Sequence, residues 1–256
     1  VIHAAATKIV PTAEYNPFEC VKTNIGGAMN LINACTDKKI KKVVALSTDK
    51  ASNPINLYGA TKLASDKLFV SGNAYSGEHP TTFSVVRYGN VMGSRGSVIP
   101  VFLQKIAQNK PLTLTDGNMT RFLMTLDEAV DLVFFAFSHG NNGDTLVQKS
   151  PASTMNEITS ALVRAAGKKD HKIGNIGIRH GEKMYETLVT KEEMMKASDL
   201  GNYFKIKSDT RGLNYEKYFS DGNNSKTLYD EYNSSNTKIL TKEELIQILL
   251  KLPEVK

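Results

Sequence analysis

The fold is indicated most clearly by residues 45–62, which read ALSTDKASNPINLYGATK. The apolar, β-branched run at 43–47 predicts a buried strand, and the stretch from 57 to about 72 predicts a long helix after an Asn-Pro loop. Working outward, the runs at 1–5 and 82–88 predict two more buried strands, and 17–35 predicts the helix between the first two. Short apolar runs that alternate with amphipathic helices are typical of α/β proteins, so we expect a Rossmann-like, doubly wound parallel sheet.

The second half of the chain predicts shorter and more mixed elements. We expect helices at 99–109, at 127–138 with Asp127 as N-cap, at 154–167 ending on a glycine, and at 241–252 with a Thr241–Glu244 capping box. Short strands are expected at 112–115 and 121–125, and the polar segment 202–236 has no assignment. We therefore predict a cofactor-binding part with the catalytic residues at 1–100. A smaller, mainly substrate-binding α/β part follows at 101–256, and some of its elements return to the first sheet.

The glycine-rich turn that normally opens a dinucleotide-binding sheet does not occur in the sequence. There is no G-x-G-x-x-G, and the glycines at 89, 93 and 96 follow the third predicted strand instead of the first. We therefore expect the chain to begin after the first strand–helix units of such a sheet, and we expect this fragment alone to be inactive. The residues that choose between NADP and NAD would lie in that missing part.

Bulk properties exclude several classes of protein. A chain of 256 residues can bury a core without disulfides. A single helix would hold Cys20 and Cys35 about 22 Å apart, beyond the ~7 Å limit for a disulfide. The net charge of +6 is spread over alternating basic and acidic residues, and the five histidines are scattered, so we expect neither a nucleic-acid partner nor a metal. No apolar run is long enough to span a bilayer, so we expect a cytoplasmic protein, with membrane attachment through a preceding region left open.

Tyr58 and Lys62 lie four residues apart and share one face of the predicted helix. An ammonium beside a phenol favours the phenolate, so we expect Lys62 to lower the pKa of Tyr58 and make it a base towards a sugar hydroxyl. Tyr-x-x-x-Lys alone is a weak signal, and Tyr203 and Lys207 repeat it with no suitable strand before them. The alternative for the first pair is a half-buried tyrosine beside a solvated lysine. The preceding strand and Ser-Thr-Asp-Lys run favour the functional interpretation.

Asp49 and Lys50 stand where the strand at 43–47 ends, at the edge where open α/β sheets bind ligands. A carboxyl and an amine placed side by side can act as acid and base on neighbouring carbon atoms. The alternative is an ordinary loop salt bridge of little energetic consequence. The apolar strand on one side and the Pro-containing loop on the other favour the chemical interpretation.

Several stretches together carry a resemblance to a known family. They are HAAATKIVPTAEYNPFECVKTNI (3–25), STDKASNPINLYGATK (47–62), RYGNVMGSRGSVIP (87–100), MTRFLMTLDEAV (119–130) and RHGEK (179–183). They resemble the UDP-N-acetylglucosamine 4,6-dehydratases of the extended short-chain dehydrogenase/reductase superfamily. These bacterial lyases begin pathways to pseudaminic acid and other 6-deoxy-amino sugars of flagellin glycans, capsules and O-antigens. The resemblance implies an NADP-dependent hydro-lyase, with NAD left open.

The resemblance also implies a catalytic role for each matching residue. Tyr58 with Lys62 would take the sugar O4 proton while the C4 hydride passes to the nicotinamide, and Thr48 would hydrogen-bond the same hydroxyl. Lys50 would then remove the C5 proton and Asp49 would protonate the departing C6 hydroxyl, after which the hydride returns to C6. Lys50 can be a base only if its pKa is lowered. Some relatives carry methionine in place of Tyr58, so the tyrosine favours inversion at C5 over retention.

The matching positions further imply two binding sites. The cofactor would lie against Ala5, Ala6, Lys8, Tyr58, Lys62 and the backbone of Val91. The UDP-sugar would contact Asn24, Asn90, Arg95, Arg121, Arg179 and Glu182, since arginine forks suit a pyrophosphate and a carboxylate suits ribose hydroxyls. The implied partners are UDP-N-acetylglucosamine and further copies of the chain in a homo-oligomer.

Two alternatives stay open. A nucleotide-sugar 4-epimerase catalyses no elimination and lacks an acid–base pair at this place, so Asp49 and Lys50 disfavour it. A non-catalytic nucleotide-sugar-binding relative would bind UDP without turnover, which the intact Thr48, Asp49, Lys50 and Tyr58 disfavour. The related hexose 4,6-dehydratases carry Asp-Glu in place of Asp49-Lys50.

Overall fold

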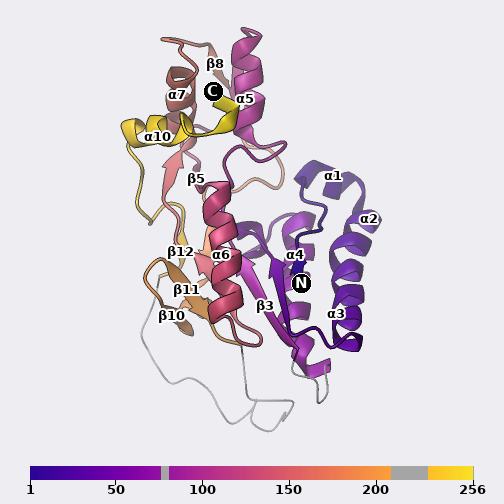
Figure 1. The fold of residues 1–256 in the computed structure, drawn as a ribbon. Coiled ribbons are helices and arrows are strands. Elements are labelled where there is room, and N and C mark those ends of the chain that lie inside the picture. Colours follow the sequence, from indigo (N-terminus) through magenta and orange to yellow (C-terminus); the bar gives the residue numbers. More distant parts are fainter. Residues whose placement is uncertain (76–80, 209–229, 256) are drawn as a thin grey trace.

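The computed structural model describes residues 1–75, 81–208 and 230–255, and its central feature is a six-stranded sheet (Figure 1). The strand order is β1-β2-β3-β6-β11-β10. Parallel pairing joins β1 (Ile2–His3), β2 (Lys42–Leu46), β3 (Thr82–Arg87) and β6 (Thr145–Gln148). Antiparallel pairing adds β11 (Tyr203–Ile206) and β10 (Ala197–Asp199). The predicted α/β class with a largely parallel sheet is confirmed, although β1 is shorter than the expected 1–5 and β6 was not predicted.

Helices cover both faces of the sheet because neighbouring residues of each strand point to opposite sides. Val43 and Ala45 of β2 pack against α3 (Gly27–Asp37) and α4 (Leu57–Ser71) on one face. Val44 of the same strand packs against α6 (Leu126–His139) on the other face. A strand buried on both faces reads as a continuous apolar run, which explains why β2 and β3 could be found in the sequence.

The amino-terminal helical region is more broken than the single helix predicted at 17–35. It consists of α1 (Val10–Tyr15), α2 (Pro17–Val21), a π-helical turn η1 (Lys22–Gly26) and α3. Asn24, one of the predicted substrate residues, lies in the π-helical turn, a feature that is frequent at functional sites. Both cysteines are buried free thiols, as expected.

A second core lies apart from the sheet, where α5 (Val98–Ala107), α7 (Met155–Ala165) and α10 (Lys242–Leu249) gather with β4 (Leu112–Leu114) (Figure 1). The Thr241–Glu244 capping box of α10 is confirmed. Asp127 does not cap α6. The N-cap is Thr125, whose hydroxyl accepts from the backbone N–H of Glu128, and Asp127 falls in the first turn.

Short elements complete the described chain. Paired strands are β5 (Thr120–Phe122) with β7 (Ala152–Thr154), β9 (Thr187–Val189) with β12 (Tyr232–Asn233), and β4 with β8 (Ile173–Asn175). The helical turns are η2 (Asp49–Ala51), η3 (Gly72–Tyr75), α8 (Lys191–Met194) and η4 (Pro253–Val255). Tyr203 lies in β11, so Tyr203 and Lys207 do not share a helical face. Part of the unassigned 202–236 segment lies outside the described residues. Within the described ranges, none of the helices has the length and apolar character needed to cross a membrane.

Candidate active site

The segment after β2 is held in place by a short turn that the strand end and α4 enclose. Thr48 is extended and caps η2, with its hydroxyl oxygen 3.4 Å from the backbone nitrogen of Lys50. The same hydroxyl donates to Asp49 Oδ1 at 3.0 Å, and the backbone N–H of Asp49 donates to the carbonyl of Tyr88 at 3.0 Å. A Cβ on Gly59 would come within 2.2 Å of the Lys50 carbonyl oxygen, so only glycine allows α4 to pack this closely against the turn.

Lys50 lies between two buried carboxylates. Its Nζ is 3.1 Å from Asp49 Oδ1 and 3.5 Å from Glu186 Oε1, and both acidic residues are buried. Burial alone would lower the pKa of Lys50, but the charges of Asp49 and Glu186 outweigh it and raise that pKa above its ordinary value. The lowered pKa that a base at this position requires is therefore not found, and this arrangement holds Lys50 as an ammonium ion.

Tyr58 and Lys62 are brought to the same place, but not with the predicted effect of one on the other. Burial raises the pKa of Tyr58 to about 12, against the opposing effects of the Lys50 ammonium and a hydrogen bond with Thr48. The ammonium of Lys62 donates to the Leu46 carbonyl at 2.7 Å, and burial lowers the pKa of Lys62. The expectation of a Tyr58 pKa lowered by Lys62 is therefore wrong: the pKa is raised, and the groups that oppose the rise are Lys50 and Thr48.

A buried charge network ties the active-site helix to the rest of the sheet. Ser47 donates to Asp66 of α4, and Arg87 at the end of β3 lies 3.9 Å from the same carboxylate. Arg87 also makes a two-pronged contact with Glu193 of α8, at 2.8 and 3.0 Å. Sequence analysis did not identify this network, because its members come from four separate parts of the chain.

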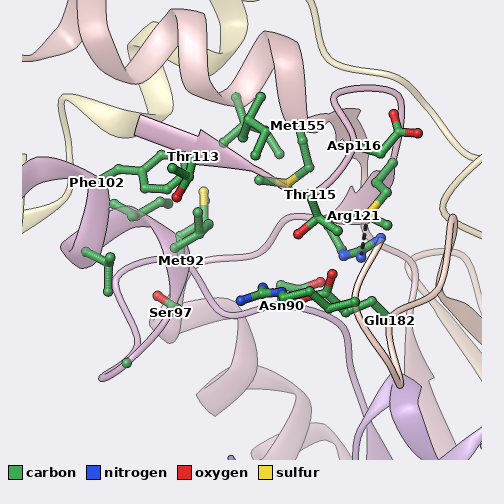
Figure 2. A pocket seen from close by; sticks show the side chains of 18 of the residues that line it. Asn90, Met92, Ser97, Phe102, Thr113, Thr115, Asp116, Arg121, Met155 and Glu182 are labelled. Carbon is green, nitrogen blue, oxygen red and sulfur yellow. Dashed lines mark hydrogen bonds and ion pairs between the residues drawn. The ribbon is translucent and has the colours of Figure 1, made fainter. Parts of the chain in front are cut away.

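A cavity of about 440 Å³ collects most of the predicted substrate residues (Figure 2). Asn90, Arg121, Arg179 and Glu182 line it, as does Val91 from the predicted cofactor site. Figure 2 shows Asn90, Arg121 and Glu182 on one side and the apolar Phe102 and Met92 on the other. Arg179 forms an ion pair with Glu182, and one oxygen of Glu182 and the amide oxygen of Asn90 are buried without a hydrogen-bond partner among the described residues. The cavity thus offers cationic and polar groups at one end and an apolar surface at the other.

Two predicted substrate residues lie elsewhere. Arg95 is exposed and does not line the cavity. Asn24 is buried, and its amide is used within the protein: it donates to the Thr7 carbonyl and to the Thr61 hydroxyl, each at 3.0 Å, and accepts from the Thr7 N–H at 2.8 Å. These contacts fix the segment after β1 against α4, so in this structure Asn24 positions backbone.

The predicted cofactor residues Ala5, Ala6 and Lys8 follow β1 and are exposed at the carboxyl edge of the parallel strands. The hydrogen bonds of Thr7 to Asn24 hold this segment beside α4, and burial, with the nearby charge of Lys62, lowers the pKa of His3. Among the described residues, Lys62 has one hydrogen-bond partner, so two of its three donors are available to a ligand. Small exposed residues beside these donors fit the nicotinamide end of a dinucleotide.

Two charged residues of the site were missed by sequence reasoning. Glu186 is buried, and its Oε1 lies 4.0 Å from Arg121 Nε as well as 3.5 Å from Lys50 Nζ. Lys183 donates to the carbonyl of Ser52 at 2.7 Å. The only available signal was that both come shortly after Arg179, since no spacing in the sequence relates them to Lys50.

Comparisons with known proteins agree with this fold. The sequence profile described as "Polysaccharide biosynthesis protein" matches residues 1–208, and the profile of its C-terminal part matches 209–256. A UDP-glucose 4-epimerase of Rickettsia bellii is 52% identical over 255 residues, which are 100% of this chain and 74% of that protein.

Solved structures show the same architecture. Pen from Bacillus thuringiensis superimposes with a TM-score of 0.88 and 40% identity, covering 100% of this chain and 76% of that one. DesIV of Streptomyces venezuelae, a dTDP-glucose 4,6-dehydratase with NAD and TYD bound, gives a TM-score of 0.63 at 21% identity, over 71% of this chain and 62% of its own. The predicted Rossmann-like class is thereby confirmed.

Proposed function

The chain belongs to the polysaccharide biosynthesis protein family, and from this premise we propose that it is a nucleotide-sugar 4,6-dehydratase that acts on UDP-N-acetylglucosamine. The observation that carries the proposal is the pair of the buried Asp49 and the half-buried Lys50, whose 3.1 Å contact lies beside Thr48 and Tyr58. An acid and a base on adjacent residues suit the removal of water across neighbouring carbons. The product would be a UDP-2-acetamido-2,6-dideoxy-4-keto-hexose, inverted at C5, for a bacterial surface or flagellin glycan.

The first step is the oxidation of C4. A bound nicotinamide cofactor, NADP by resemblance, would accept the C4 hydride and later return it to C6. Tyr58 takes the O4 proton, and Thr48 holds the same hydroxyl. Burial raises the pKa of Tyr58 to about 12 even with the Lys50 charge and the Thr48 hydrogen bond opposing the rise, so the phenolate is a small fraction near neutral pH and the oxidation should speed up as the pH rises. Lys62 has donors left for the cofactor and binds the end of β2.

The second step is the elimination of water. Lys50 as an ammonium cannot remove the C5 proton, but its contact with Asp49 provides the solution. Transfer of one proton from Lys50 to Asp49 creates an amine and a carboxylic acid together. The amine then takes the C5 proton while the acid protonates the C6 hydroxyl, which leaves as water, so the pair returns to an ammonium and a carboxylate. One proton of the pair thus serves both partners, and C5 would gain a further proton, originating from solvent, when the hydride returns to C6.

The cavity would hold the nucleotide. Arg121 and Arg179 are suited to the pyrophosphate, because guanidinium groups form two-pronged, charge-assisted hydrogen bonds with phosphate oxygens. Glu182 and Asn90 each carry a buried oxygen without a partner among the described residues, so both can accept hydrogen bonds from ribose or base. Arg95 and Asn24 have no contact with this cavity and act, at most, outside the nucleotide site.

A 4-epimerase is the second candidate, and the name of the Rickettsia relative at 52% identity favours it. It would use Thr48, Tyr58 and Lys62 in the same way. It gives no role to Asp49 and Lys50, which are held in place by the Thr48 cap and the Tyr88 carbonyl. For that reason we prefer the dehydratase.

The test is to incubate the full-length protein, with any strand–helix units that precede residue 1, with UDP-N-acetylglucosamine and NADP in deuterated water and to follow the products by mass spectrometry and NMR. Loss of one water with deuterium at C5 supports the dehydratase, and the configuration at C5 reports inversion or retention. A C4 epimer of unchanged composition identifies an epimerase instead. Binding of UDP without any conversion contradicts both candidates. A parallel incubation with NAD reports the cofactor preference.

A further inference from the structure

Glu186 is a buried carboxylate at the reactive pair that the mechanism above does not use. It precedes β9, and its side chain reaches between Lys50 Nζ at 3.5 Å and Arg121 Nε at 4.0 Å. Its second oxygen, Oε2, is buried without a hydrogen-bond partner among the described residues. A buried carboxylate costs free energy unless it is paired, so this placement needs a reason.

The backbone of Glu186 is fixed on both sides by one residue. Its N–H donates to the Ser234 hydroxyl at 3.0 Å, and its carbonyl accepts from the Ser234 N–H at 2.8 Å. Ser234 is fully buried and its hydroxyl also contacts Thr120, the neighbour of Arg121. The backbone from which the carboxylate projects is therefore held by Ser234 independently of Lys50.

We propose that Glu186 is a positioning residue for the elimination: it holds Lys50 against Asp49 and keeps one proton within that pair. The inference rests on the proposed dehydratase function. With Asp49 as its only carboxylate neighbour, the Lys50 ammonium would form an ion pair without net charge. Glu186 adds a second negative charge, so Lys50 holds its proton more tightly. That proton therefore stays available to be passed to Asp49.

The other charges around Lys50 act in known directions. Arg121 lies on the far side of Glu186 and opposes protonation of Lys50, and Lys183 and Tyr58 interact with the same group. The proton is lost with an apparent pKa that belongs to the coupled set rather than to one residue. Once it is lost, Asp49 has nothing to donate to the C6 hydroxyl. Glu186 therefore sets the pH above which the elimination stops.

The first experiment measures Lys50 without requiring turnover. Competitive acetic anhydride labelling of the holoenzyme at one fixed alkaline pH, read by mass spectrometry, reports the fraction of each lysine that is a free amine. In Glu186→Gln the labelling rate of Lys50 should rise about tenfold or more, since an opposite charge within 4–6 Å shifts a pKa by about 1 to 3. Lys62 is the internal reference, because Glu186 is not among the groups that affect it. An unchanged Lys50 labelling rate would overturn the proposal.

The second experiment follows dehydration against pH. The fall of the dehydration rate at high pH, which we call the alkaline limb, should begin at lower pH in Glu186→Gln. C4 oxidation, read as nicotinamide absorbance, should be retained. A purely structural role would lower the rate equally at every pH and would contradict the proposal. Glu186→Asp keeps the negative charge, so its dehydration rate should fall at nearly the same pH as in the wild type. This variant also controls for a loss of activity that is caused by misfolding. Glu192→Gln, an exposed glutamate of α8, is the matched control.

The two proposals fail in different ways. If the wild-type enzyme makes no dehydrated product, the proposed function fails and the role of Glu186 in elimination fails with it. If the wild type dehydrates and Glu186→Gln has the same alkaline limb, only the inference about Glu186 is refuted.

Discussion

Replacing Asp49 with asparagine should separate the oxidation of the sugar from the loss of water. Asparagine has the same shape but no acidic proton, so it cannot protonate the C6 hydroxyl. Loss of a positioned acid slows its step by about 10²- to 10⁴-fold. At about 1.4 kcal/mol per factor of ten, this corresponds to roughly 3 to 6 kcal/mol in the elimination barrier. The oxidation of C4 relies on Tyr58 and Thr48 and should continue.

The structure also sets the expected loss of stability for this variant. Asp49 is fully buried, and its Oδ1 accepts from the Thr48 hydroxyl at 3.0 Å and from Lys50 at 3.1 Å. The amide oxygen of asparagine can keep both contacts. Its NH₂ group would replace Oδ2, which has no partner among the described residues, at a cost of about 1 to 3 kcal/mol for a buried unsatisfied group. Lys50 keeps Glu186 at 3.5 Å, so the variant should fold.

The assay is a single turnover with UDP-N-acetylglucosamine, followed by nicotinamide absorbance and by mass. Asp49→Asn should accumulate reduced cofactor and the 4-keto sugar, with little loss of water. Asp37→Asn, an exposed residue at the end of α3, controls for the substitution. Dehydration at the wild-type rate in a folded Asp49→Asn would refute the assignment of Asp49 as the acid.

Three further predictions concern neighbouring groups. Tyr58→Phe should abolish C4 oxidation. In the wild type the oxidation rate should rise with pH towards the Tyr58 pKa of about 12, because only the phenolate accepts the O4 proton. Stopped-flow measurement of nicotinamide absorbance tests both expectations. Arg179→Gln should raise the KM for the UDP-sugar about tenfold or more with a smaller effect on kcat, since a hydrogen bond to a charged group contributes about 1.5–3 kcal/mol. Arg87→Met should lower the free energy of unfolding by about 3 to 5 kcal/mol in urea titrations, because it leaves the buried Asp66 and the half-buried Glu193 without their cation. Although burial alone would raise the pKa of Glu193, the charge of Arg87 outweighs burial and holds that pKa below its usual value. The stability that the pair contributes is therefore present above the usual glutamate pKa and is lost as the pH falls through the lowered pKa. The difference in the free energy of unfolding between wild type and Arg87→Met should shrink in acid.

The sequence predicted the elements whose signals are local. Strands β2 and β3 are apolar runs because both of their faces are buried, and α4 begins at Asn56, whose side chain caps it. The chain after residue 100 was harder. β6 reads TLVQ, too short and too mixed to stand out, yet it is the strand that joins β3 to the antiparallel edge. Its burial is decided by partners that are distant in sequence.

The site divides in the same way. Thr48, Asp49, Lys50 and Tyr58 are close in sequence and are brought together by one turn and one helix, so their proximity could be predicted. The charge state of Lys50 could not, because it depends on Glu186, which reaches the pair from another part of the chain. Nor could the orientation of Lys62, which the Leu46 carbonyl determines. Positions follow from local pattern, whereas pKa values follow from long-range packing.

The choice between dehydratase and epimerase finally depends on what a buried ion pair contributes. Removing two charges from water costs several kcal/mol for each ion, and apolar residues of similar size are often as stable in their place. Asp49 and Lys50 therefore gain the protein little stability, and Glu186 adds a third charge with an unsatisfied oxygen. An epimerase would carry this cost without using it. The proposed dehydratase would use both groups of the pair once in every turnover, and such a use would account for charges that the fold itself does not require.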